Sequence, residues 1–210
     1  MPAFYRVVVE NEWSEWGGPS TGTQYDMKNA CPHCGTGAVP VGPLFLARLR
    51  VPRHLVWATL SEVLVADEFA QALEDMGTHC LAEVRHRRTG QVLPVKGLRA
   101  EAVLPPFSSR TSGYARYRPC PECGRDGFFD AGPPEPDTAG KLHLVYEGLD
   151  PSYLEKNVLW TYEGFGRSAL RSPFEDSVIA KPIHVLSQRV VDWLKEHGAK
   201  GLLFAPATLT

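Results

Sequence analysis

The sequence predicts an α+β fold, mostly antiparallel sheet with a few short helices. Two observations support this fold class. Short apolar segments punctuated by glycine and proline outnumber helical patterns along the 210 residues. Only two stretches carry apolar residues at helical spacing, and in both a glycine follows and then a strand-like segment. The helices are therefore expected to be few and the sheet to dominate.

The first half of the chain reads mainly as strands. An opening strand is predicted at residues 4–10, which contain three consecutive valines, and the stretch with Trp13 and Trp16 then breaks it. Apolar segments follow at 44–49 and 55–60, the second favouring a strand. A hairpin turn at 87–91 joins strands predicted at 80–86 and 92–96, and 100–104 extends the same sheet.

A linker is predicted at residues 131–140, which are too rich in proline and glycine for a helix or a sheet ladder. It divides the chain into a lobe at 1–130 and an α/β lobe at 141–210, which either stand apart or pack as a single domain. The second lobe is expected to contain a strand at 142–146, a loop-rich stretch, a helix at about 187–197 and a last strand.

The two helical stretches resemble each other. When residues 65–81 are laid over 186–202, three positions are identical: Leu73 and Leu194, Gly77 and Gly198, Leu81 and Leu202. Asp67 and Ser187 are the expected N-caps, and the two glycines suit the position that ends a helix. The likeness is either a true repeat or chance similarity between two common helix–glycine–strand units, and the sequence leaves both open.

A short cysteine motif occurs twice, as Cys31-Pro-His-Cys34-Gly and as Cys120-Pro-Glu-Cys123-Gly. Each motif is a knuckle that can bring two thiolates to one ion, and four thiolates complete the tetrahedral shell of a structural zinc site. The proline stiffens the turn, and the glycine supplies a position that can take a positive φ. We therefore expect Cys31, Cys34, Cys120 and Cys123 to hold one Zn²⁺ that staples the fold.

Redox and disulfide roles fit these cysteines less well. Neither motif opens a helical pattern, as a thioredoxin-like site would, and five cysteines cannot all pair. Cys80 is expected to be a buried free thiol, because a fifth ligand would overfill the zinc shell. His33, inside the first knuckle, is interpreted as a solvated residue and not as a ligand.

Composition favours a globular protein that acts inside the cell. The 43% hydrophobic content is enough for a core, and no apolar run is long enough to span a bilayer. The N-terminal residues lack the pattern of a secretory signal, so a cytoplasmic location is expected. The net charge of −2 conceals an asymmetry. Residues 85–125 contain nine Lys/Arg and two Glu, whereas residues 126–180 contain ten Asp/Glu and four Lys/Arg.

No catalytic set stands out, so the chain is predicted not to be an enzyme and to have no small-molecule substrate. The chain contains no HExxH, GxSxG, P-loop or GxGxxG motif. A zinc deaminase would need a His-x-Glu or Cys-x-Glu upstream of Pro119-Cys120, and none is suitably placed. A shell of four cysteines also leaves no open position for water or substrate, which argues against Lewis-acid catalysis.

The paired cysteine motifs, the strand-like N-terminus with Trp13 and Trp16, and the pattern from Ser187 to Pro206 resemble the double-CxxCG motif family. That family includes immunity proteins of bacterial swarm-incompatibility toxin systems. The resemblance covers nearly the whole chain, from Phe4 to Pro206. It implies a cytoplasmic, non-enzymatic protein that binds and neutralises a cognate protein toxin. It carries over no contact residues beyond the four cysteines.

Two surfaces follow from the charge asymmetry. Acidic residues among aromatics in 126–180, with Glu147 near Tyr146 and Trp160, would suit a basic toxin, unless those aromatics simply fill the core. The alternative function is a zinc-ribbon-like nucleic-acid-binding protein. It would use basic residues interleaved with tyrosines around the second knuckle, namely Arg110, Tyr114, Arg116, Tyr117, Arg118 and Arg125. The negative net charge argues against nucleic acid.

Overall fold

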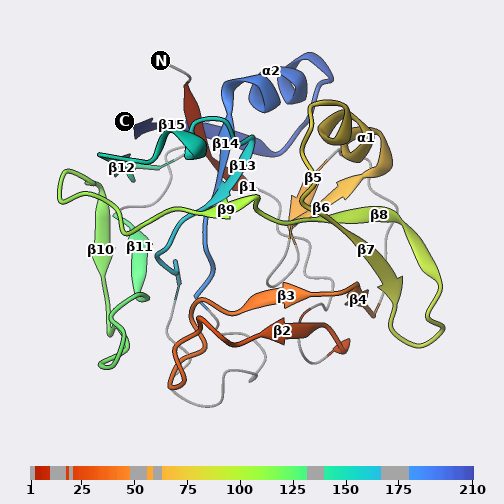
Figure 1. The fold of residues 1–210 in the computed structure, drawn as a ribbon, viewed down its shortest axis with the longest axis horizontal. Helices are drawn as coiled ribbons and strands as arrows, with labels where there is room; N and C mark the ends of the chain where they lie inside the picture. The colour runs from red at the N-terminus through yellow and green to blue at the C-terminus, as the bar shows by residue number, and fades with distance from the viewer. Residues whose placement is uncertain are drawn as a thin grey trace.

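The structure is a computed structural model that describes residues 3–9, 18, 21–47, 56–58, 63–131, 140–166 and 180–210. Within them the fold is α+β, with two α-helices and a dominance of strands (Figure 1). Eight strand pairings are antiparallel and three are parallel. The predicted fold class is confirmed.

The larger sheet has six strands, and its central strand comes from the start of the chain. The order is β12 (Val145–Tyr146), β15 (Leu202–Leu209), β1 (Phe4–Val9), β14 (His184–Ser187), β13 (Val158–Trp160) and β9 (Ala102–Val103). β1 is antiparallel to both of its neighbours, β14 and β15. The sheet therefore combines strands from 1–130 with strands from 141–210; the division into two lobes stays a prediction.

The second sheet has five strands. Their order is β4 (Leu44–Leu46), β7 (Leu81–His86), β8 (Val92–Leu98), β6 (Val63–Ala66) and β5 (Val56–Ala58). The predicted hairpin is present as β7 and β8, with its turn closed by hydrogen bonds between His86 and both Gly90 and Gln91. The segments predicted at 44–49 and 55–60 contain β4 and β5; β4 ends at Leu46, and of the second segment only 56–58 lie within the described residues.

Two small antiparallel hairpins stand apart from the sheets. One pairs β2 (Gln24–Asp26) with β3 (Val39–Val41), and the other pairs β10 (Tyr114–Arg116) with β11 (Phe128–Asp130). In Figure 1 the β2–β3 hairpin lies at the end of the molecule opposite the helices. Each hairpin carries one cysteine knuckle between its strands.

The helices α1 (Asp67–Asp75) and α2 (Gln188–Glu196) each have nine residues and lie side by side (Figure 1). The rings of Phe69 and Trp193 stack between them, with centroids 5.0 Å apart. The predicted caps need correction. Ala66, not Asp67, is the N-cap of α1, and Ser187 is the N-cap of α2 without a capping bond, because its hydroxyl donates to Asn157. A 3-10 turn, η2 (Pro151–Tyr153), precedes β13.

Strand alternation places apolar residues on both faces of the two sheets. In β14, Leu186 joins the core that contains both helices, whereas the adjacent Val185 joins a second core on the other face. In β6, Val65 likewise faces the helices and Leu64 faces a third core. Both sheets therefore pack on one shared helical layer.

Several sequence predictions fall outside or at the edge of what is described. Trp13 and Trp16 lie outside the described residues, as do 132–139 of the predicted linker. The strand expected at 142–146 is confined to Val145 and Tyr146. No helix of the described residues is long and apolar enough to cross a membrane.

Candidate metal centre

The two hairpins bring the four predicted cysteines together. All four Sγ atoms lie within 4.8 Å of one another. The Sγ atoms of Cys31 and Cys120 are 3.9 Å apart, and those of Cys34 and Cys123 are 3.6 Å apart. Cys31, Cys34 and Cys120 are buried, whereas Cys123 is partly exposed. The cluster can hold a metal ion, because four sulfurs at such separations can face one tetrahedral centre.

Both knuckles have the same backbone turn. The N–H of Gly35 donates to the carbonyl of Cys31 at 2.8 Å, and the N–H of Gly124 donates to that of Cys120 at 2.9 Å. The two glycines have φ values of 72° and 60°, in the left-handed region that a residue with a Cβ rarely adopts. This turn places both cysteines of a motif on the same side, which is why the motif needs its glycine.

Neighbouring polar groups orient the cysteines. The Oγ1 of Thr36 lies 3.2 Å from the Sγ of Cys34, and the N–H of Arg125 donates to the Sγ of Cys123 at 3.4 Å. The fully buried Asp126 accepts the N–H of Cys120 at 2.6 Å. Outer groups of this kind fix first-shell ligands. Thr36 and Asp126 were not predicted as supporting residues, and Arg125 was expected on a nucleic-acid surface, although all three closely follow the two motifs.

The pKa shifts of the thiols differ within the cluster: burial acts to raise the pKa of Cys31, but hydrogen bonds from the backbone of Cys34 and His33 outweigh it and lower that pKa. Burial raises the pKa of the Cys34 thiol well above its ordinary value, and it also raises the pKa of Cys123. Four thiolates in this setting would repel one another, so they require a cation among them. A soft divalent metal would supply that charge, and its binding would displace the thiol protons.

The fifth cysteine lies elsewhere. Cys80 is buried in the apolar core beneath the two helices and is not part of the cluster. Burial raises the pKa of its thiol to about 12, so it remains protonated at neutral pH. His33 is also outside the cluster; its Nδ1 lies 3.6 Å from a carboxylate oxygen of Glu122 on the opposite knuckle.

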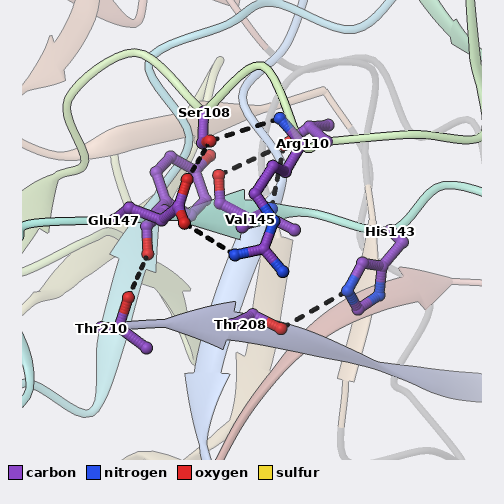
Figure 2. A network of polar contacts seen from close by, with 9 residues as sticks. Ser108, Arg110, His143, Val145, Glu147, Thr208 and Thr210 are labelled. Carbon is purple, nitrogen blue, oxygen red and sulfur yellow. Dashed lines mark hydrogen bonds and ion pairs between the residues drawn. The ribbon is translucent and has the colours of Figure 1, made fainter.

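Within the described part of 126–180, two aromatics of the predicted acidic surface are buried. Tyr146 and Trp160 are 1% and 8% exposed, so they belong to the core and cannot line an interface. Glu147 is exposed, but Figure 2 shows it bound to Ser108 and Arg110, with an oxygen 2.8 Å from the Arg110 guanidinium. For Tyr146 and Trp160 the alternative that the sequence had left open therefore holds, because these two aromatics fill the core.

The predicted basic set is also largely engaged within the chain. Arg110 pairs with Glu147, and the guanidinium of Arg125 lies 3.7 Å from the centroid of the Tyr162 ring while donating to the carbonyls of Asn29 and Tyr162. Tyr117 is the exception, because its ring is 53% exposed with Arg118 over it.

A hollow of about 490 Å³ lies beside the first knuckle, between the β2–β3 hairpin and the ends of β13 and β14. In its wall, the indole of Trp160 donates to Nε2 of His184 at 2.8 Å. Burial lowers the pKa of His184 to about 4, so the imidazole is neutral and accepts this bond. The absence of catalytic machinery stays a prediction.

Comparison with protein-family models finds no match for the chain. Comparison with curated proteins likewise finds no match.

Proposed function

We propose that this chain is an immunity protein, which binds and neutralises a cognate bacterial toxin in the cytoplasm and carries one structural zinc. The observation that carries the proposal is the cluster of four sulfurs within 4.8 Å of one another. Such a donor set fills a tetrahedral shell and leaves no position for substrate, so its metal is structural. A scaffold stapled by a structural metal would suit a protein whose task is to bind another protein.

Zinc is the metal that this donor set favours. Zinc prefers four thiolates in tetrahedral geometry, and its binding energy adds directly to folding. Protein purified without chelator should contain about one zinc per chain by elemental analysis. Protein that contains iron in stoichiometric amount, or no metal, would remove zinc from the proposal.

The toxin partner is supported by the resemblance of the paired knuckles and the C-terminal pattern to the double-CxxCG motif family. The test is co-expression with the product of the neighbouring gene, because toxin and immunity genes are expected to be adjacent. We expect that product to be toxic alone, harmless with this chain, and to co-purify with it. A toxic neighbour that this chain neither binds nor neutralises would refute the pairing.

A second candidate, nucleic-acid binding, is favoured by one observation, the exposed Tyr117 ring with Arg118 stacked on it beside the second knuckle. Aromatic and arginine side chains together suit a single-stranded base. A salt titration separates the candidates. Binding of nonspecific DNA or RNA that weakens steeply with salt supports the second candidate, whereas no binding at low salt excludes it.

A further inference from the structure

The order of structural elements that begins at β1 occurs again from β8. From β1 the chain forms a strand, a hairpin with Cys31 and Cys34, three strands (β4, β5, β6), the helix α1 and the strand β7. From β8 it forms a strand, a hairpin with Cys120 and Cys123, three strands (β12, β13, β14), the helix α2 and the strand β15. Among the described residues, only β9 and the turn η2 have no counterpart in the first series.

The two sheets also correspond strand by strand. The order β4-β7-β8-β6-β5 in one matches β12-β15-β1-β14-β13 in the other. The edge pairings β4–β7 and β12–β15 are both parallel. The three remaining pairings in each set are antiparallel. A shared helix–glycine–strand unit alone does not explain five strands in the same order, with the same relative direction in each of the four pairings.

Registers and local contacts extend the correspondence. Val56 pairs with Val65 in β5–β6, and Val158 pairs with Leu186 in β13–β14, where Leu186 is the residue that the sequence alignment sets against Val65. No residue intervenes between β6 and α1, or between β14 and α2. Both helices end with the same backbone hydrogen bond. The N–H of the residue after the terminal glycine donates to a leucine carbonyl, that of Leu73 in α1 and that of Leu194 in α2.

The edge strands β4 and β12 are bound in the same way by a threonine. The hydroxyl of Thr21, just before the first hairpin, donates to the carbonyl of Phe45 in β4. The hydroxyl of Thr111, just before the second hairpin, donates to the carbonyl of Val145 in β12. These contacts lie far from the helices, so they are independent evidence of the same architecture.

One feature breaks the simple repeat. β8 opens the second series but lies between β6 and β7 of the first, and β1 opens the first series but lies between β14 and β15 of the second. We infer that the chain is a tandem duplication, repeat 1 from β1 to β7 and repeat 2 from β8 to β15, in which the two repeats have exchanged their first strands and share one metal site.

The distances between the cysteine sulfurs agree with one metal site shared by the two repeats. The short separations join Cys31 to Cys120 and Cys34 to Cys123, so the first and the second cysteine of one motif face the matching cysteine of the other. Each repeat alone has two thiolates at this site, half of a tetrahedral shell. This part of the inference rests on the proposed structural metal, whereas the strand exchange rests on topology alone.

The experiment cuts the full-length protein between the repeats. A specific protease site is inserted after Thr89, in the exposed turn between β7 and β8. After cleavage, we expect both fragments to elute as one species of unchanged size with unchanged metal content. They should remain together after chelation, because each fragment keeps a strand in the middle of the other's sheet. Fragments that separate in native buffer would overturn the exchange.

A cross-link within the cut protein identifies the partner of β1. Phe4 pairs with Ser187, the N-cap of α2, and the equivalent N-cap in its own repeat is Ala66. Phe4→Cys with Ser187→Cys should give a disulfide that joins the two fragments, identified by peptide mass. The matched control, Phe4→Cys with Ala66→Cys, should give none, and its cross-linking instead would refute the exchange.

Metal analysis of the cut protein tests the shared site separately. Separation of the fragments in denaturant should release the metal, and joint refolding should restore one metal per pair. Retention of the full metal content by one fragment alone would show that the site is not shared. Protein that never contains metal would refute the zinc proposal but would leave the strand-exchange test intact.

Discussion

At the scale of single residues, Cys120 and Cys80 show how position decides the role of a thiol. Cys120 →Ser removes one of four sulfurs at the metal centre, whereas Cys80→Ser changes a thiol in the apolar core. We expect the first variant to lose the metal and about 3 kcal/mol or more of unfolding free energy, because metal binding and folding are coupled. The second should keep its metal. Elemental analysis and denaturant unfolding measure both.

Glu163 gives a pH-dependent prediction. Its side chain is buried; one carboxylate oxygen accepts the N–H of Phe107, and the other has no hydrogen-bond partner. Burial raises the pKa of this carboxyl above its ordinary 4.5, despite the opposing N–H of Phe107 and the charge of Arg125. Its contribution to stability is therefore fully present below pH 4.5 and is lost as the pH rises through the raised pKa.

Glu163→Gln should remove that dependence, because the amide oxygen still accepts from Phe107 and no charge is buried. Denaturant unfolding of both proteins from pH 4.5 to 8 should show the variant gaining stability relative to the original protein as the pH rises. A difference that stays constant over this range would show that Glu163 does not titrate differently in the folded state.

The metal ligands could be predicted from the sequence because a Cys-Pro-x-Cys-Gly motif determines its own turn. The residues that support the ligands could not, because their contacts cross the chain. Asp126 is an ordinary acidic residue until the fold buries it beside Cys120. Arg125 was assigned to a nucleic-acid surface, but its guanidinium donates to the carbonyls of Asn29 and Tyr162 within the chain.

At the scale of elements, the glycines that end the helices allow a matched pair of tests. Gly77 and Gly198 have φ values of 81° and 65°, and a Cβ on either would meet nothing within 4 Å. Gly77→Ala and Gly198→Ala should therefore each lower the unfolding free energy by about 1 kcal/mol, from backbone strain alone. Thermal or denaturant unfolding measures the two values, and a large difference between them would contradict the equivalence.

Gly97 provides the contrast. A Cβ there would lie 2.1 Å from the Cδ1 atom of Leu44, which is 1% exposed in the core of the five-stranded sheet. Gly97→Ala should therefore cost more than either helix-end variant. Leu44→Ala in the same chain removes the clash, so the two changes together should cost less than the sum of the two alone.

The helices were predictable because their periodicity and their end glycines are local signals. Their N-caps were harder to predict. Ser187 occupies the cap position, yet its hydroxyl bonds to Asn157 on a neighbouring loop, a competition that no local pattern reveals. The short strands were predicted in kind but not in length, since hydrogen-bonded partners decide where a strand ends.

At the scale of the whole molecule, the metal and the sheets are expected to stabilise different regions. Chelation should remove protection from amide hydrogen exchange in the two hairpins, at residues 24–41 and 114–130, because among the described residues their knuckles share, besides the cysteine cluster, only exposed polar contacts, such as that of His33 with Glu122 and that of Arg125 with Asn29. Amides of β1, β14 and β15 should stay protected by the two cores that flank their sheet. Uniform loss of protection throughout the chain would contradict this division.

The exchange of strands lay beyond prediction from sequence. Residues 4–9 were expected to form a strand, but nothing in their alternation indicates that Tyr5 pairs with Leu186 and Pro206. Pairing partners at such separation are chosen by the whole packing arrangement and not by local propensity. The two copies of the cysteine motif and the weak likeness of 65–81 to 186–202 were the traces of the duplication in the sequence.

The central position of β1 has a consequence for synthesis on the ribosome. β1 emerges from the ribosome before both of its neighbours, β14 and β15, which lie far later in the chain. At 5–20 residues per second, the roughly 200 residues from β1 to the end of β15 require about 10–40 s. During that time the apolar segment Phe4–Val9 has no native partner. The nascent chain must therefore be shielded, by a chaperone or by transient pairing, until β14 and β15 have emerged.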